Sequence, residues 1–142
     1  MMKHAARILT LTLAVILLCG TLTACGAPAK DPEDAKTALK ENGYTILESD
    51  TALPIAFKAL GYDLTTVISA TKTATDDKGD TVLEHVTVFY FADKDNATKA
   101  MEKVKKEAED DKKDQDESRW IEPTQSGAMI YYGTKAAVKA AK

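Results

Sequence analysis

The chain has 142 residues, of which 44% are hydrophobic and 29% are charged, and its formal net charge is −3. This length is enough for one domain with a core of its own. The acidic balance argues against a nucleic-acid-binding protein, because such proteins present basic patches to the phosphate backbone.

The first 25 residues have the three parts of an export signal. Lys3 and Arg7 form a short basic head, an apolar run follows over residues 8–19, and small residues precede Cys25. This pattern is typical of a signal that is removed after export. The apolar run is also too short for a membrane-spanning helix, which needs roughly 20 residues.

The last four residues of this segment, Leu22-Thr23-Ala24-Cys25, resemble the lipobox of bacterial lipoproteins at all four positions. In that family the cysteine sulfur receives a diacylglyceryl group, the signal is removed in front of it, and the new amine is often acylated. The resemblance, which covers residues 1–25 only, implies that Cys25 carries lipid and holds the protein at the extracytoplasmic face of the cell membrane. Beyond the signal, the chain is similar in general character to small uncharacterised Gram-positive lipoproteins. The alternative is an ordinary signal peptide with a cysteine near its cleavage site.

Removal of the signal would make the remaining chain more acidic. Residues 1–24 contain two of the bases, Lys3 and Arg7, and none of the acids, so 17 Lys and Arg would remain against 22 Asp and Glu, a formal charge of −5. Such a charge argues against direct adhesion to anionic lipid headgroups, which attract basic segments. We therefore expect the lipid on Cys25 to provide the membrane attachment.

The mature protein is expected to fold without cysteine chemistry. Cys19 would leave with the signal and Cys25 would carry the lipid, which excludes a disulfide and a cysteine metal site. Residues 26–30 are predicted to be a short linker, which reaches at most about 17 Å when extended. A single domain over residues 31–142 should therefore lie close to the membrane.

A helix is expected directly after the linker. Asp31 can cap it, Pro32 suits its first position, and Asn42-Gly43 can end it. The next three elements are predicted from their composition to be a strand over residues 44–48, a helix over residues 53–60 and a strand over residues 64–73.

The strongest strand signal lies over residues 82–91, which are rich in β-branched and aromatic side chains. The turn sequence at residues 76–80 separates them from the strand at residues 64–73, so the two strands should form a hairpin.

The longest helix is expected to begin at Asp93 or Asp95. Its apolar side chains recur at helical spacing, at Ala97, Ala100, Met101, Val104 and Ala108. Residues 109–117 are almost all charged, so we expect the helix to fray there into a solvated loop. The remaining elements are expected to be a strand that starts at residues 120–121 and is broken by Pro123, a strand over residues 128–132 and a helix over residues 134–142.

These elements predict an α+β fold, with helices packed on an antiparallel sheet. After the first helix the expected order is the ferredoxin-like β-α-β-β-α-β, with an extra helix at each end. A cystatin-like curved sheet around a helix is the alternative.

The mature chain offers few groups for catalysis or metal binding. It contains no G-x-S-x-G, H-E-x-x-H or glycine-rich phosphate motif. Its one histidine, His85, lies inside a predicted strand, where a structural role is expected. The acidic stretches at residues 76–80 and 110–117 do not match a calcium-binding EF-hand loop. We therefore expect no enzyme, no metal and no cofactor.

Alternation along the hairpin predicts two different faces, because successive strand residues point to opposite sides. The even positions, such as Leu64 and Ile68, are mostly apolar and are expected to face the core. The odd positions mix hydroxyls, a histidine and phenylalanines, and their candidate partner-binding residues are Thr65, Ser69, His85, Thr87 and Phe89. The alternative is that the first or the last helix covers this face.

The expected function is that of a membrane-anchored lipoprotein whose domain binds a protein or another envelope component without catalysis. The alternative is a small-molecule or peptide binder that serves a transporter or sensor. A pocket with convergent polar groups would favour this alternative, whereas a flat sheet with exposed aromatics would favour the first interpretation.

Overall fold

The computed structural model describes residues 26–48 and 52–142. The predicted signal and Cys25 lie outside the described residues. Four α-helices occur in the described part, namely α2 (Pro32–Glu41), α3 (Ala52–Ala59), α4 (Lys94–Lys112) and α5 (Lys135–Ala140), together with the short 3-10 helix η1 (Glu117–Arg119). The strands are β1 (Thr45–Glu48), β2 (Leu64–Thr75), β3 (Thr81–Phe91), β4 (Trp120–Ser126) and β5 (Met129–Thr134). None of the helices in these residues is long and apolar enough to cross a membrane.

The five strands form one sheet in the order β1-β2-β3-β5-β4, and every neighbouring pair is antiparallel. The predicted α+β class with an antiparallel sheet is thus confirmed. The expected chain order is present with one further strand, β4, which includes Pro123. A register shift between Ile121 and Thr124 accommodates this proline at the sheet edge, where a missing N–H is tolerated.

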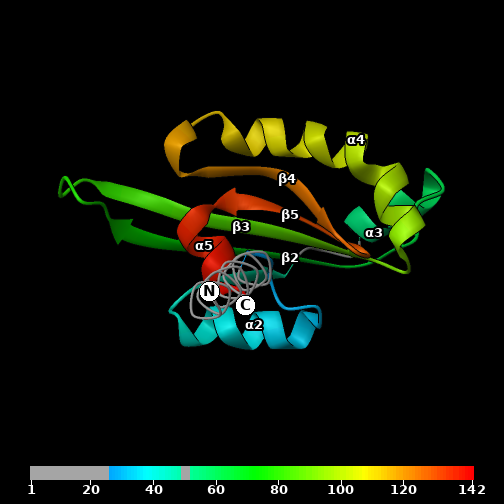
Figure 1. The fold of residues 1–142 in the computed structure, drawn as a ribbon, viewed down its shortest axis with the longest axis horizontal. Coiled ribbons are helices and arrows are strands. Elements are labelled where there is room, and N and C mark those ends of the chain that lie inside the picture. The colour runs from blue at the N-terminus through cyan, green and yellow to red at the C-terminus, as the bar shows by residue number, and fades with distance from the viewer. Residues whose placement is uncertain (1–25, 49–51) are drawn as a thin grey trace, which may run out of the picture.

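Helices cover both faces of the sheet (Figure 1). We call the side that packs on α2 and α5 the α2/α5 face, and its core residues include Leu39, Ile68, Val86 and Val138. We call the opposite side the α3/α4 face, and its core residues include Phe57, Phe89, Val104 and Tyr132. The domain therefore has two apolar layers, one on each side of the central strands.

The odd face of the hairpin is covered over part of its length, so the expected open binding face is wrong at Thr87 and Phe89. Phe89 is 1% exposed and Thr87 is 5% exposed, because α3 and α4 pack over this face. The face is covered by helices, as the alternative expected, but these helices are α3 and α4 and not the first or the last helix. The small side chains on the buried stripe of α4 bring that helix close to the sheet.

One residue of the predicted alternation lies on the other face. Leu64 packs with Phe57 on the α3/α4 face, although its even number placed it with Ile68. A register shift between Leu64 and Thr66 inserts Thr65 as an extra residue. Such a bulge reverses the side-chain alternation of the residues that precede it.

Helix α4 continues to Lys112, so the predicted fraying from residue 109 is also wrong. Its first turn is capped by the Asp93 side chain, which accepts a hydrogen bond from the Asn96 backbone. Two side chains of the sheet contact its last turn: the Tyr132 hydroxyl donates to Asp111, and Glu122 pairs with Lys112. These tertiary contacts outweigh the cost of concentrating charge in one turn.

Most of the predicted linker is part of the folded domain. Pro28 is buried, and Ala27 and Ala29 pack against the core of the α2/α5 face. The Ala29 N–H donates to the Ala141 carbonyl at 2.8 Å, and the Tyr90 hydroxyl donates to the Ala29 carbonyl at 2.8 Å. Gly26 and Lys30, at the two ends of the described linker, are exposed.

Candidate functional site

A cleft of about 220 Å³ lies between α3, the C-terminal half of α4 and the middle of the sheet. We call it the α4 cleft. Its lining consists of Leu53 from α3, Val67 and Ser69 from β2, Thr87 and Phe89 from β3, Glu107, Asp110 and Asp111 from α4, and Tyr132 from β5. The cleft forms because α4 packs on the β3, β4 and β5 side of the face, whereas α3 packs on β2.

Two hydroxyls and an imidazole meet beside the cleft. Ser69 and Thr87 are register partners on β2 and β3, and their hydroxyl oxygens lie 3.3 Å apart. His85 Nε2 lies 3.3 Å from the Ser69 oxygen and 3.1 Å from the Thr87 oxygen. Each hydroxyl can either donate or accept, so the cluster can rearrange its protons to suit a bound group.

The imidazole of His85 packs beside two aromatic rings, Trp120 and Tyr132. Its ring stacks on Trp120 with centroids 6.4 Å apart and lies 6.2 Å from the ring of Tyr132. Burial lowers the pKa of His85 below its ordinary value, and the negative charge of Asp111 partly opposes this shift. The neutral imidazole is therefore the favoured form at neutral pH.

Tyr132 connects the floor of the cleft to its rim. The ring is 2% exposed, and its hydroxyl donates to Asp111 Oδ2 at 2.6 Å. Burial is the main reason that the pKa of Tyr132 lies far above its ordinary value, and the hydrogen bond to the Asp111 carboxylate adds to the effect. The phenol thus stays protonated and fixes the position of the carboxylate.

The three carboxylates on the rim differ in their counter-ions. Glu107 pairs with Lys103 at 3.1 Å, and Asp110 pairs with Lys113 at 2.7 Å, a contact that lowers the pKa of Asp110. No ion pair among the described residues includes Asp111, whose hydrogen-bond partner is the neutral Tyr132. The cleft therefore presents a negative charge that no lysine or arginine of the described chain neutralises.

Four of the five predicted site residues meet at this cleft. Ser69, Thr87 and Phe89 line it, and His85 contacts two of its hydroxyls. Thr65 is separate, because its hydroxyl donates to the Tyr90 carbonyl at the bulge at 2.8 Å. Phe89 belongs to the apolar floor and is not an exposed anchor.

Sequence reasoning missed the acidic half of the cleft. Glu107, Asp110 and Asp111 follow one another at i, i+3 and i+4, the spacing that places side chains on one helical face. This spacing was a usable signal once the helix was known to extend to Lys112. Tyr132 could be assigned to a strand, but nothing in its sequence neighbourhood indicated a partner on α4.

The arrangement is suited to a group that donates several hydrogen bonds and carries positive charge. Carboxylate oxygens accept only, and the hydroxyls of Ser69 and Thr87 can accept as well. Leu53, Val67 and Phe89 supply an apolar wall beside these acceptors. Within the described part of the chain, no group of three or more His, Cys, Asp or Glu side chains is placed to hold a metal ion.

Comparison with known proteins adds no relative. No protein-family model, no curated protein and no solved structure matches the chain.

Proposed function

We propose that this protein is a lipoprotein, held at the extracytoplasmic face of the cell membrane through Cys25, whose domain binds a small organic cation in the α4 cleft. The ligand class is a primary amine or a guanidinium with a short apolar body, either as a free molecule or as the end of a peptide. The anchoring rests on the resemblance of residues 22–25 to a lipobox.

The carboxylate of Asp111 is the observation that carries the binding proposal. It lies on the rim of a concave site, it is oriented by a buried phenol at 2.6 Å, and it lacks a cationic partner among the described residues. An ammonium group has three donors and no acceptor, so the carboxylate with Ser69 and Thr87 would satisfy it. A charge-assisted hydrogen bond of this kind is about twice as strong as a neutral one.

The size of the site supports a small ligand. Its volume of about 220 Å³ is below the roughly 300–1,000 Å³ typical of pockets for drug-sized molecules. The convergent polar groups around the cleft favour a small-molecule or peptide binder. A flat protein-binding face is disfavoured, because Phe89, its expected anchor, is buried.

Ligand binding can be tested by thermal unfolding and calorimetry on the detergent-solubilised lipoprotein. We expect alkylamines and arginine to raise the melting temperature, and carboxylates of matched size to leave it unchanged, because a ligand that binds only the native state stabilises it by mass action. Asp111→Asn should abolish the effect while keeping an acceptor for Tyr132.

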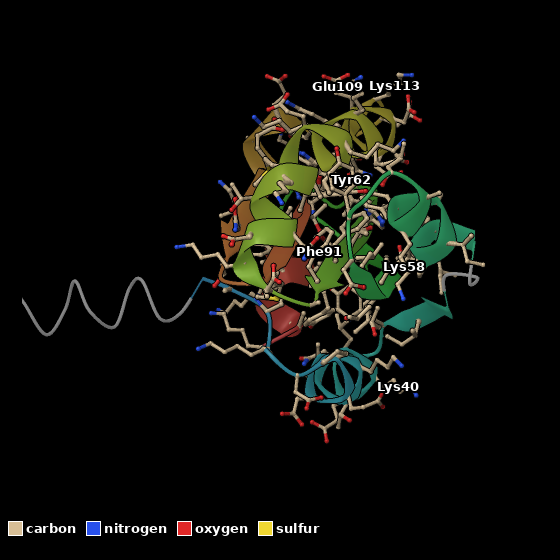
Figure 2. The ribbon with its side chains drawn as sticks, turned by 90° about the vertical axis from the view of Figure 1, so that its right-hand side faces the viewer. Lys40, Lys58, Tyr62, Phe91, Glu109 and Lys113 are labelled. Atoms are coloured by element: carbon tan, nitrogen blue, oxygen red, sulfur yellow. The ribbon has the colours of Figure 1, made fainter. Side chains whose placement is uncertain are left out.

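Glu109→Gln is the matched control for Asp111→Asn. It removes the same charge from α4, but Glu109 lies outside the cleft and points away from the domain (Figure 2). Equal loss of amine binding in both variants would indicate a general electrostatic effect. Stabilisation by carboxylates instead of amines would contradict the proposal.

The anchoring is tested separately. Labelled palmitate should enter the wild-type protein and should not enter Cys25→Ser, which should be released or left unprocessed. Equal labelling of the two proteins would contradict the role of Cys25.

Exposed apolar side chains on α3 favour a second candidate function, docking of an envelope protein. Ile55 is 65% exposed and Leu60 is 58% exposed, and both lie on or just after the helix that supplies Leu53 to the cleft. Crosslinking in intact cells should then give a defined product that Ile55→Ser removes. Leu83→Ser is the control, because Leu83 is also exposed but lies on β3.

A further inference from the structure

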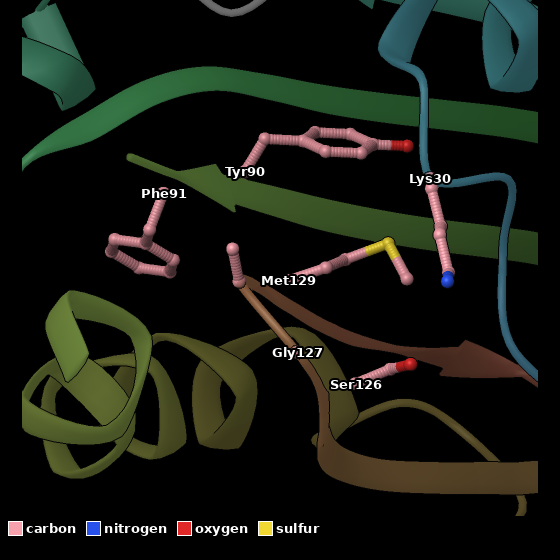
Figure 3. A pocket seen from close by; sticks show the side chains of 7 residues that line it. Lys30, Tyr90, Phe91, Ser126, Gly127 and Met129 are labelled. Carbon is pink, nitrogen blue, oxygen red and sulfur yellow. The ribbon is translucent and has the colours of Figure 1, made fainter. Parts of the chain in front are cut away.

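A second cavity lies beside Lys30, four residues after the first described residue (Figure 3). It has a volume of about 350 Å³ and is lined by Lys30, Tyr90, Phe91, Met129 and the turn at residues 126–128. The rings and the thioether give it a mainly apolar wall. The ammonium of Lys30 and the hydroxyl of Ser126 lie on the same side of it (Figure 3). This combination suits a molecule with an apolar chain and an anionic head.

The fold fixes this cavity close to the predicted lipid anchor. Ala29 is hydrogen-bonded to the domain through both its N–H and its carbonyl, and Pro28 is buried. Residues from Ala27 onward therefore belong to the domain. Only Gly26 separates Cys25 from Ala27, so the Cα atoms of these two residues can lie at most about 7 Å apart. A lipid on Cys25 would hold this end of the domain against the headgroup layer.

Three lysines lie at this end of the domain, together with the carboxylate of Asp31, whose charge acts on Tyr90. The hydrogen bond between Ala29 and Ala141 brings two exposed lysines, Lys30 and Lys142, to the same site, and exposed Lys139 lies at the end of α5 nearby. Cations at a membrane surface are attracted to anionic phospholipids within about one Debye length. The net negative charge therefore does not prevent a local contact.

From the short tether, the apolar wall and the position of Lys30, we infer that the surface around this cavity faces the membrane and that the cavity takes up an anionic phospholipid. Lys30 binds the phosphate, and one acyl chain lies against Tyr90, Phe91 and Met129. The inference rests on the anchoring part of the proposed function and does not depend on the ligand of the α4 cleft. The domain would then have a fixed orientation, with the side that carries Lys58 turned away from the bilayer (Figure 2).

The test uses full-length lipoprotein, acylated at Cys25 as verified by mass, in phosphatidylglycerol vesicles with spin-labelled acyl chains. The mature chain has no cysteine beyond Cys25, so Ala128→Cys and Lys58→Cys can each carry one fluorophore at a defined place. Ala128 lines the cavity, whereas Lys58 is exposed on α3. We expect several times stronger quenching at residue 128 than at residue 58.

A charge variant separates the phospholipid site from simple proximity. Lys30→Gln should reduce the quenching at residue 128 in phosphatidylglycerol to the level seen in phosphatidylcholine, and Lys106→Gln, an exposed lysine on α4, should not. Equal quenching at residues 128 and 58 would overturn the orientation, and no difference between the two lipids would overturn the phospholipid site. If the protein cannot be acylated at all, the anchoring fails and the orientation fails with it, whereas amine binding at the α4 cleft would persist.

Discussion

The two faces of the sheet are covered by helices in different ways. On the α2/α5 face, the helices and the N-terminal segment pack into a largely apolar layer that contains Leu39, Ile68 and Val138. On the α3/α4 face, two helices cover different strands, and the polar cleft lies where their coverage ends. The comparison indicates that the site arises from two features of the α3/α4 face, namely its incomplete coverage by helices and the polar side chains that β2 and β3 present there.

The contrast is sharpest along the odd positions of β3. Phe89 is 1% exposed under the helices, whereas Leu83 on the same side of the same strand is 49% exposed near the hairpin end. His85 and Thr87 lie between them at the boundary, with His85 half-buried and Thr87 buried. A single strand therefore passes from solvent through a polar site into the core.

The largest expected effect is from Phe89→Ala. Removal of this buried ring, which packs 5.7 Å from Phe57 and 6.1 Å from Tyr132 between centroids, should cost about 3–5 kcal/mol of unfolding free energy. Leu83→Ala is the control and should change stability by only about 0.5 kcal/mol, as exposed positions usually do. Denaturant unfolding measures both. Similar small losses would mean that α3 and α4 do not cover this face in solution.

A slightly smaller effect is expected from Gly133→Ala. The backbone at Gly133 has φ +145°, and a Cβ there would lie 2.2 Å from the His85 carbonyl oxygen. Strain and overlap should together cost roughly 2–4 kcal/mol. Gly79→Ala separates the two causes, because Gly79 has φ +85° with nothing within 4 Å of the added atom, and it should cost about 1 kcal/mol. Equal losses of unfolding free energy in the two variants would mean that the close contact with the His85 carbonyl adds nothing to the cost at Gly133.

A third prediction compares a Tyr→Phe substitution on each of the two faces of the sheet. Tyr132→Phe removes the 2.6 Å hydrogen bond to Asp111 and should cost about 1.5 kcal/mol, near the lower end for a bond to a charged group because Asp111 is exposed. Tyr131→Phe on the α2/α5 face keeps the buried ring and should cost less. Tyr132→Phe should also weaken amine binding, since it frees the Asp111 carboxylate to move. Retained amine binding in Tyr132→Phe would mean that Tyr132 is not needed to orient the Asp111 carboxylate for the ligand.

Much of the fold follows from patterns that a sequence expresses locally. The caps of the first and longest helices, the β2–β3 hairpin and the alanine stripe of α4 are all set by neighbouring residues, and each was predicted. The β4–β5 hairpin has a local signal too, because Gly127 with φ +60° begins its two-residue turn. Pro123, however, conceals that the strand expected to start at residues 120–121 continues to Ser126.

The site required information that local patterns do not contain. Alternation shows that Ser69, His85 and Thr87 share a face, but it does not show which helix covers that face. The contact between Tyr132 and Asp111 joins a strand to the last turn of α4 across 21 residues. The run of charge over residues 109–117 predicts a solvated loop, and such a loop does not place its carboxylates beside the hydroxyls.

The smallest expected effect is the pH dependence of stability that His85 causes, at the boundary between the polar cluster and the acidic rim of the α4 cleft. Burial lowers the pKa of His85 in the folded state relative to the unfolded chain, where it is near 6.5. The unfolded state therefore binds the proton more tightly, so the stabilisation is fully present above about pH 6.5 and is lost as the pH falls through the folded pKa. We expect the unfolding free energy of the wild type to decline on acidification below this pH, and the decline to be shallower in His85→Gln. Chemical denaturation at a series of pH values from 7.5 to about 5 measures the slope, and NMR titration of the imidazole reports its pKa directly.

The charge of Asp111 opposes the shift, so Asp111→Asn should lower the pKa of His85 further and leave an amide at the same position. A pKa that does not respond to Asp111→Asn would mean that the carboxylate does not act on the imidazole, and the polar cluster and the acidic rim would then be independent parts of the cleft.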